Sequence, residues 1–214
     1  MIWRLMLRDM RMALRGGNYM LPCAFFLILI VIYPFAVGSD TQLLARTGGG
    51  MMWIALLLAS LLPVDRIVAP DVDAGVIDQM VVRGISEEAI IIAKWLAHMV
   101  ALGMPLLAAA LPGAILMGLG GAELGQLLIG LAVGLPGLTA LGVLVAALGA
   151  GGRGPMVASS LAILPFAIPL LIFGAGSSGG DDVRGALQWL SATSLLLVAI
   201  LPFAGGAALR AARE

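Results

Sequence analysis

The sequence has few of the residue types on which catalytic and cofactor sites depend. Among its 214 residues there is one cysteine (Cys23), one lysine (Lys94) and one histidine (His98), and charged residues make up 11% of the chain. A single cysteine excludes an internal disulfide framework and any paired-cysteine metal motif. The lysine is not part of a Gly-Lys-Ser/Thr phosphate loop, nor the histidine of a His-Glu-x-x-His zinc motif. We therefore expect a non-catalytic chain with no resident cofactor or metal, so that any ATP is hydrolysed by another subunit.

Apolar residues and glycine dominate what remains. Hydrophobic residues make up 61% of the chain and glycine occurs 29 times, a usage outside that of soluble globular domains. Runs of about 20 apolar residues are long enough to cross a bilayer as helices. We therefore predict an all-α polytopic membrane protein with six transmembrane helices, near residues 20–37, 51–64, 88–117, 124–148, 156–175 and 187–209.

The first 19 residues predict an amphipathic helix that lies on the membrane surface. Its basic residues, Arg4, Arg8, Arg11 and Arg15, recur at three- and four-residue steps. They lie opposite a face of larger apolar side chains. The apolar run that follows is long enough to span, whereas a cleavable secretory signal has a shorter core and a small-residue cleavage site. We therefore expect residues 1–19 to form an interfacial entry helix that leads into the first span.

Glycine and proline predict where spans are separated or interrupted. We expect a polar connection over residues 38–50, which leaves a short second span. We also expect a kink or a break in the long third span, near Gly103, Pro105 and Pro112.

The fourth span contains a small-residue pair, Gly130 and Gly134, in a Gly-x-x-x-Gly pattern. Such a pair lets two helices approach closely. It serves either packing within the chain or contact with another subunit, and the pattern alone leaves both open.

The one sizeable charged stretch covers residues 65–94, between the second and third spans. Within it we predict a short amphipathic helix over residues 71–83, started by Pro70 and ended before Gly84. Ser86 is then expected to cap the next helix, because a serine hydroxyl accepts from amides of the first turn.

This short helix is predicted to dock onto another protein. Asp71 and Asp78 share its polar face, a third acid, Asp73, projects on the apolar side, and no lysine is present. Helices that rest passively on anionic lipid carry lysine and arginine instead, so docking is the favoured interpretation and lipid contact the alternative. An apolar strip would fill a pocket in the partner. The predicted docking residues are Asp71, Asp73, Val76, Ile77, Asp78, Gln79 and Met80.

The distribution of basic residues predicts the orientation in the membrane. With the N-terminus in the cytoplasm, ten of the twelve basic residues fall on the cytoplasmic side and only Arg46 and Arg184 lie outside. Basic residues concentrate in cytoplasmic segments, so both termini and the charged stretch are expected there. The docking helix would then be accessible to a soluble partner.

Lys94 and His98 are spaced four residues apart near the cytoplasmic end of the third span, so they share one face of the helix. One interpretation is haem contact, through a propionate or an axial ligand. The favoured alternative is structural: the lysine extends to lipid headgroups and the histidine forms a hydrogen bond.

Several segments together resemble the cytochrome c maturation protein B (CcmB) family across essentially the whole chain. They are ALR (13–15), QLLAR (42–46), MW (52–53), DVDAGVIDQ (71–79), AKWLAH (93–98), LPFAIPLLIF (164–173) and PFA (202–204). The family commonly has Leu-Glu-Gln where this chain has Ile77-Asp78-Gln79, and the shorter acid leaves the docking hypothesis intact.

The resemblance implies a single ABC-transporter permease domain over residues 1–214. Its parts are the entry helix (1–19), spans one and two (20–64), a cytoplasmic loop with the coupling helix (65–87), spans three to six (88–209) and a cytoplasmic tail (210–214). It also implies a subunit of the bacterial inner (plasma) membrane that serves haem delivery to the periplasm during c-type cytochrome biogenesis. Such a subunit couples ATP hydrolysis by a separate subunit to haem export or to release of the haem-loaded chaperone.

The implied partners are several. They are the ATPase subunit CcmA, the haem-handling membrane protein CcmC with its small membrane partner CcmD, the periplasmic haem chaperone CcmE, a second copy of this chain and the lipid bilayer, with no nucleic acid. ATP would bind the partner subunit, and haem would be a substrate. The alternatives left open are an ABC permease for another substrate, a non-transporting assembly scaffold of the cytochrome maturation machinery, and an ATP-free secondary transporter.

Overall fold

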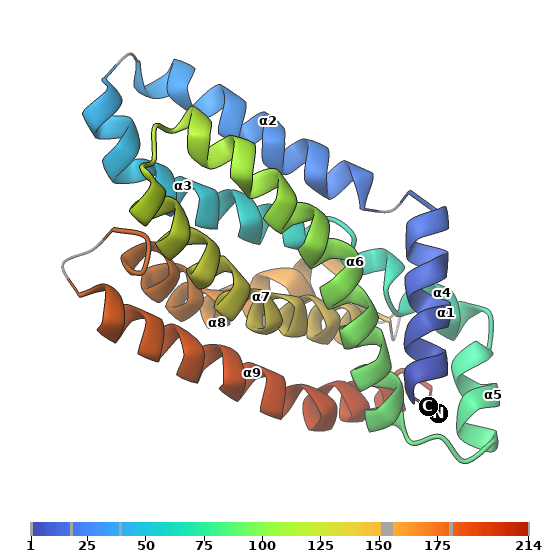
Figure 1. Cartoon of the computed structure of the whole chain (residues 1–214). Helices are drawn as coiled ribbons and strands as arrows, with labels where there is room; N and C mark the ends of the chain where they lie inside the picture. The colour runs from blue at the N-terminus through green and yellow to red at the C-terminus, as the bar shows by residue number, and fades with distance from the viewer. Residues whose placement is uncertain (1, 18, 39, 151–155, 180–181, 214) are drawn as a thin grey trace.

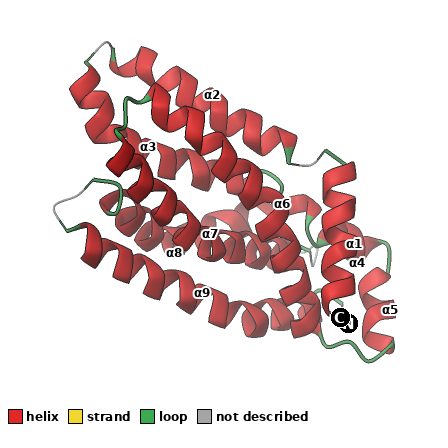
Figure 2. Ribbon diagram, viewed as in Figure 1, coloured by secondary structure: helices red, strands yellow, loops and turns green. Residues whose placement is uncertain are grey.

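All regular structure that the computed structural model describes is helical (Figure 2). The described residues are 2–17, 19–38, 40–150, 156–179 and 182–213, with the backbone alone described for residues 15 and 156–163. The long helices are α2 Met20–Val37, α3 Thr41–Leu61, α6 Glu87–Leu116, α7 Gly121–Gly149, α8 Met156–Gly176 and α9 Val183–Ala211.

These long helices have the length and composition of membrane spans. Five of these six long helices, all except α8, are long and apolar enough to cross a bilayer over their described residues. The part of α8 whose side chains are described, Leu164–Gly176, is a shorter apolar helix. The prediction of an all-helical polytopic membrane protein is therefore confirmed, while residues 151–155, between the fourth and fifth predicted spans, lie outside the described residues.

The long helices lie side by side in one bundle, with α7 at its centre (Figure 1). Helix α7 packs against α6, α8 and α9, and 67% of its most apolar window is buried, compared with 17% for α2. Helix α2 is therefore the peripheral span, with most of its side chains available to lipid.

Helix α1 (Ile2–Arg15) lies crosswise over one end of the bundle, against α6 (Figure 1). Both ends of the described chain lie at this same end of the molecule. A helix that lies crosswise to spanning helices can lie along the membrane surface, which is the arrangement predicted for the entry helix.

The glycines at the centre of the bundle form a cage around one indole ring. Trp53 of α3 is fully buried, and a Cβ atom at Gly134 of α7 or Gly174 of α8 would clash with its ring. A Cβ at Gly130 would lie 3.7 Å from Trp53 Cζ2 and would also clash with Ser177. The Gly-x-x-x-Gly pair thus serves close packing within the chain, one of the two alternatives that its pattern allowed.

The predicted polar connection over residues 38–50 is wrong. Helix α3 already begins at Thr41, where the Asp40 side chain accepts hydrogen bonds of 3.0 Å from the amides of Gln42 and Leu43. Gly48 and Gly49 are buried inside this helix, and a Cβ at Gly48 would lie 2.9 Å from Met117 Cβ. These glycines allow close packing, so the second span has 21 residues instead of 14.

Of the kink or break predicted in the third span, the break does not occur, and the kink stays a prediction. Helix α6 continues through Gly103, Pro105 and Pro112 as a single element of 30 residues. A side chain at Gly103 would clash with Leu135 of α7, and one at Gly113 would lie 2.9 Å from Ile30 of α2. The glycines therefore admit neighbouring helices, and they do not end this one.

Candidate functional site

The segment between α3 and α6 folds into three short helices at the end of the bundle where the termini lie (Figure 1). They are the 3₁₀ helix η1 (Val64–Arg66), α4 (Ala69–Asp73) and α5 (Val76–Val82). The prediction of one helix over residues 71–83 is wrong, because Gly75 adopts a left-handed φ of 65° between α4 and α5. Asp71 and Asp78 therefore belong to different helices and have different partners.

The predicted end of this segment and the start of the next helix are confirmed. Helix α5 ends at Val82, Gly84 has a φ of 81°, and the amide of Ile85 donates to the carbonyl of Met80 over 3.1 Å. The Ser86 hydroxyl accepts from the Ala89 amide at 3.3 Å and so caps α6.

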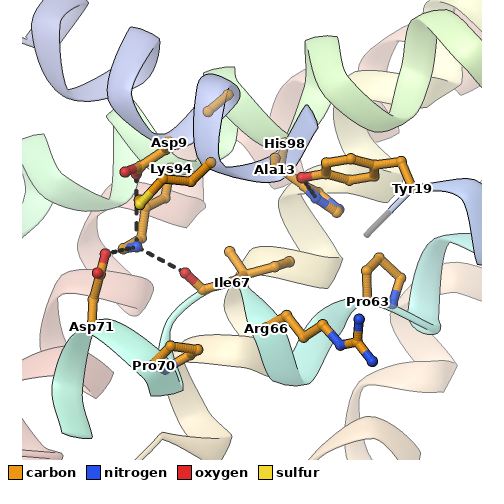
Figure 3. Close-up of a pocket in the computed structure, with 12 residues that line it drawn as sticks. Asp9, Ala13, Tyr19, Pro63, Arg66, Ile67, Pro70, Asp71, Lys94 and His98 are labelled. Carbon is orange, nitrogen blue, oxygen red and sulfur yellow. Dashed lines mark hydrogen bonds and ion pairs between the residues drawn. The ribbon is translucent and has the colours of Figure 1, made fainter. Parts of the chain in front are cut away.

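Four charged side chains from three helices form a buried group, the Lys94 cluster: Arg8 and Asp9 of α1, Asp71 of α4 and Lys94 of α6 (Figure 3 shows the last three). Lys94 Nζ lies 2.5 Å from Asp71 Oδ2 and 3.7 Å from Asp9 Oδ2, and it donates to the Ile67 carbonyl over 2.8 Å. Arg8 Nη2 lies 2.6 Å from the same Asp71 oxygen. Two cations and two anions thus balance within the cluster.

Lys94 does not extend to lipid headgroups, so that part of the structural alternative is wrong. Its side chain is only 4% exposed, because three acceptors from α1, α4 and the turn before α4 surround the ammonium. Partial burial lowers the pKa of Arg8, but the carboxylates of Asp9 and Asp71 outweigh it, so the net shift is upward. Arg8 holds α1 to α4, and Lys94 holds α6 to α4.

His98 lies one turn further along α6 and is also enclosed. Its Nδ1 is 3.4 Å from the Tyr19 hydroxyl, while Nε2 has no hydrogen-bond partner among the described residues. Burial, together with the Asp9 charge, raises the pKa of Tyr19 to about 12, so this hydroxyl stays protonated at neutral pH. The donor and the acceptor of this contact depend on the imidazole tautomer, and Nε2 lies toward Gly142 of α7.

A cavity of about 310 Å³ lies between α1, the η1–α4 segment and α6 (Figure 3). Its charged or polar lining includes Asp9, Tyr19, Arg66, Asp71, Lys94 and His98. This volume is at the lower limit for small-molecule pockets, which are about 300–1,000 Å³. Lys94 and His98 are thus brought together as predicted, but both already have contacts inside the chain, and haem contact stays a prediction. Among the described residues, no group of three or more His, Cys, Asp or Glu is placed to hold a metal.

A second group of charges, the C-terminal arginine cluster, lies at the end of α9: Asp78, Glu87, Glu88, Arg210 and Arg213. Arg213 Nε lies 2.5 Å from Asp78 Oδ1, and its Nη1 lies 2.9 Å from Glu87 Oε1. Arg210 Nη1 lies 2.6 Å from Glu88 Oε1. The predicted tail is therefore joined to the docking segment, a contact that sequence patterns missed because more than 120 residues separate the partners.

Comparison with known proteins identifies the family. Residues 1–212 match the family model described as "CcmB protein". The chain belongs to the CcmB family. It is 40% identical over 212 residues to "Heme exporter protein B" of Rhodobacter capsulatus, covering 96% of this chain and 97% of that relative. It is 39% identical over 212 residues to the protein of the same name from Paracoccus denitrificans, with the same coverage, and 34% identical over 215 residues to that of Escherichia coli K12, covering 98% of each.

The predicted docking residues of this CcmB-family chain divide between an inner and an outer face. Ile77 is 1% exposed and Met80 is 8% exposed, and both belong to the protein's own core. The outer face of α5 exposes Asp78, Gln79 and Val82, and Val82 is 85% exposed. Ile77 and Met80 of the predicted apolar strip are thus already covered by this chain. The prediction missed Val82, although it follows Gln79 by three residues and Asp78 by four and so lies on the same helical face.

Proposed function

We propose that this chain is the membrane permease subunit of an ABC complex that delivers haem to the periplasm during c-type cytochrome biogenesis. The support is its membership of the CcmB family and its likeness over nearly the full length to proteins named heme exporter protein B. The bundle of apolar helices is the architecture that such a subunit needs. Haem is then a substrate of the complex, and ATP binds a separate ATPase subunit, CcmA.

The proposed orientation places both termini and α4–α5 in the cytoplasm. Basic residues support it, because α5, the first half of α6 and the end of α9, which lie toward the end of the bundle that holds the termini, are followed by or contain Arg83, Lys94 and Arg210. The starts of α3 and α9, which contain Arg46 and Arg184, lie toward the opposite end. An ATPase subunit in the cytoplasm would meet the exposed face of α5 first.

The single observation that carries the coupling role is the outer face of α5. A large apolar side chain that is 85% exposed beside two polar ones, on a short helix outside the bundle, fits the helix-in-groove mode of recognition. Val82 is the anchor that would fill a partner pocket, and Asp78 and Gln79 form the polar rim. Ile77 is unsuitable as a test position, because Ile77→Asp would place a carboxylate in the core of this chain and unfold it.

The test is recovery of the ATPase subunit with the tagged, detergent-extracted complex. Val82→Asp is expected to lower recovery by about 5- to 30-fold, since loss of an interface anchor costs about 1–2 kcal/mol. Ala122→Asp, an exposed position in the first turn of α7 at the opposite end of the bundle, is the matched control and should leave recovery unchanged. Full recovery with Val82→Asp would reject α5 as the docking element.

A deletion strain separates this function from its alternatives. Loss of periplasmic c-type cytochromes, restored by the parent chain, is expected for a subunit of haem delivery, whereas a permease for another substrate would leave them intact. Reconstituted vesicles then distinguish haem export from release of a chaperone. Haem that stays on one side during ATP hydrolysis would favour the non-transporting scaffold over the exporter.

A further inference from the structure

Arg213 connects three elements that are far apart in the sequence. It follows the last residue of α9 by two positions, its Nε reaches Asp78 on α5 at 2.5 Å, and its Nη1 reaches Glu87 in the first turn of α6 at 2.9 Å. A guanidinium presents its donors in a fixed planar fork, so one arginine can hold two carboxylates at a defined separation. The side chain is 21% exposed, which leaves it partly shielded from solvent.

Arg210 provides an internal comparison, because it has the same charge one turn earlier. Its guanidinium lies 2.6 Å from Glu88 Oε1 and 3.6 Å from Glu87 Oε2, and both acids belong to α6. Both arginines therefore join α9 to α6. Of the two, Arg213 is the one that also reaches α5.

Helix α5 needs an external hold to keep its position. It has seven residues, too few for a stable isolated helix, and glycines with left-handed φ angles flank it at Gly75 and Gly84. Its inner face is held by Ile77 and Met80 in the core. The Asp78–Arg213 pair adds a polar side-chain contact between α5 and the rest of the described chain.

We propose that Arg213 is a positioning residue that fixes the docking helix α5 to the start of α6 and the end of α9, so that a displacement of α5 by the ATPase subunit reaches both spans. The coupling part of this inference rests on the proposed function, whereas the positioning part does not. Asp78 Oδ1 is used by Arg213, and the side chain remains 60% exposed, so a partner can contact Asp78 at the same time.

The first test measures the position of α5 without any partner. Hydrogen exchange of the amides of residues 76–82 is compared in Arg213→Gln, in Arg210→Gln and in the parent chain. We expect exchange in α5 to become at least fivefold faster in Arg213→Gln and to stay within twofold of the parent in Arg210→Gln. Equal exchange in the two variants would overturn the proposal.

A charge exchange distinguishes positioning from a general loss of stability. In Asp78→Arg with Arg213→Asp, the new arginine faces both the new aspartate and Glu87, so the tie between α5 and α6 is rebuilt with reversed polarity. We expect α5 protection to return to within twofold of the parent, while Asp78→Arg alone stays deprotected. Failure of the double variant to recover protection would also overturn the proposal.

The second test addresses coupling. In the reconstituted complex, Arg213→Gln should keep full recovery of the ATPase subunit but transport severalfold less haem per ATP hydrolysed, with Arg210→Gln close to the parent. Transport per ATP that is unchanged in Arg213→Gln would reject the transmission role. If the parent chain itself retains no ATPase subunit, the proposed function fails, and the exchange measurements still decide the positioning role.

Discussion

The Lys94 cluster and the C-terminal arginine cluster hold the two halves of the same segment, and they differ in burial. The difference lies in the central pairs: Lys94 and Asp71 are 4% and 15% exposed, whereas Arg210 and Glu88 are 47% and 31% exposed. The outer member of the first cluster, Arg8, is 32% exposed, and the inner members of the second, Arg213 and Glu87, are 21% and 14% exposed. A charge removed from water must be paired, so the Lys94–Asp71 pair is a requirement of the fold. A charge in water gains little from pairing, so the Arg210–Glu88 pair has little effect on stability.

The buried cluster should give the largest effect. Lys94→Met leaves two carboxylates that are 12% and 15% exposed facing one arginine, and we expect a loss of about 3–5 kcal/mol in the free energy of unfolding. The measurement is unfolding of the purified protein in mixed detergent micelles. Lys94→Met combined with Asp71→Leu removes both partners and should recover at least half of the loss. A cost no larger than that of Arg210→Gln would show that burial does not distinguish the clusters.

Tyr19, at the edge of the buried cluster, should give an intermediate effect that depends on pH. Its pKa is raised to about 12, so the neutral phenol stabilises the fold fully below pH 10, and this contribution is lost as the pH rises from about 10 through about 12. The chain has two tyrosines, so Tyr33→Phe leaves Tyr19 as the sole tyrosinate chromophore. We expect a midpoint near 12 in the folded protein and near 10 after denaturation. A folded midpoint near 10 would contradict the enclosure of Tyr19.

The exposed cluster should give a small effect that salt removes. Arg210→Gln is expected to lower the free energy of unfolding only slightly, and far less than Lys94→Met does. The difference should decline between about 0.05 M and 0.5 M NaCl, because screening weakens exposed pairs, while the cost of Lys94→Met should change little. A salt-independent cost for Arg210→Gln would place this pair with the buried ones.

His98 should give the smallest effect on haem. The imidazole is 1% exposed and already contacts Tyr19 within the chain. We expect His98→Ala to leave the haem content per assembled complex unchanged, as measured by the haem absorption band. An assembled complex that loses this band would assign His98 to haem binding.

Local signals in the sequence predicted the parts of the site that neighbouring residues determine. Ser86 caps α6 and Gly84 ends α5 as expected, because a cap and a left-handed turn involve residues a few positions apart. The break at Gly75 was missed, because a single glycine is tolerated within a helix and only the dihedral angle reveals the turn.

Contacts between distant segments were beyond reach of these signals. The sequence placed Lys94 near a membrane surface, but its partners Asp9 and Asp71 lie 85 and 23 residues away and come from elements whose docking no pattern specifies. The same holds for Ile77, where periodicity identified an apolar face correctly but could not tell whether this chain or a partner covers it. Gly48 and Gly49 were interpreted as part of a loop, because flexible turns and close helix packing both favour glycine and the sequence does not distinguish them.

The indole of Trp53 fills space that two other helices leave by having no side chain at Gly134 and Gly174. The volumes at these three positions are therefore coupled, so that a chain of this family with a small residue in place of the tryptophan should carry larger residues at the two glycines. Substituted singly, each position is expected to be intolerant, whereas an exchange of size between them should restore a folded bundle. Among related sequences, the summed side-chain volume at these three positions would thus stay nearly constant, and the three residues would change together or not at all.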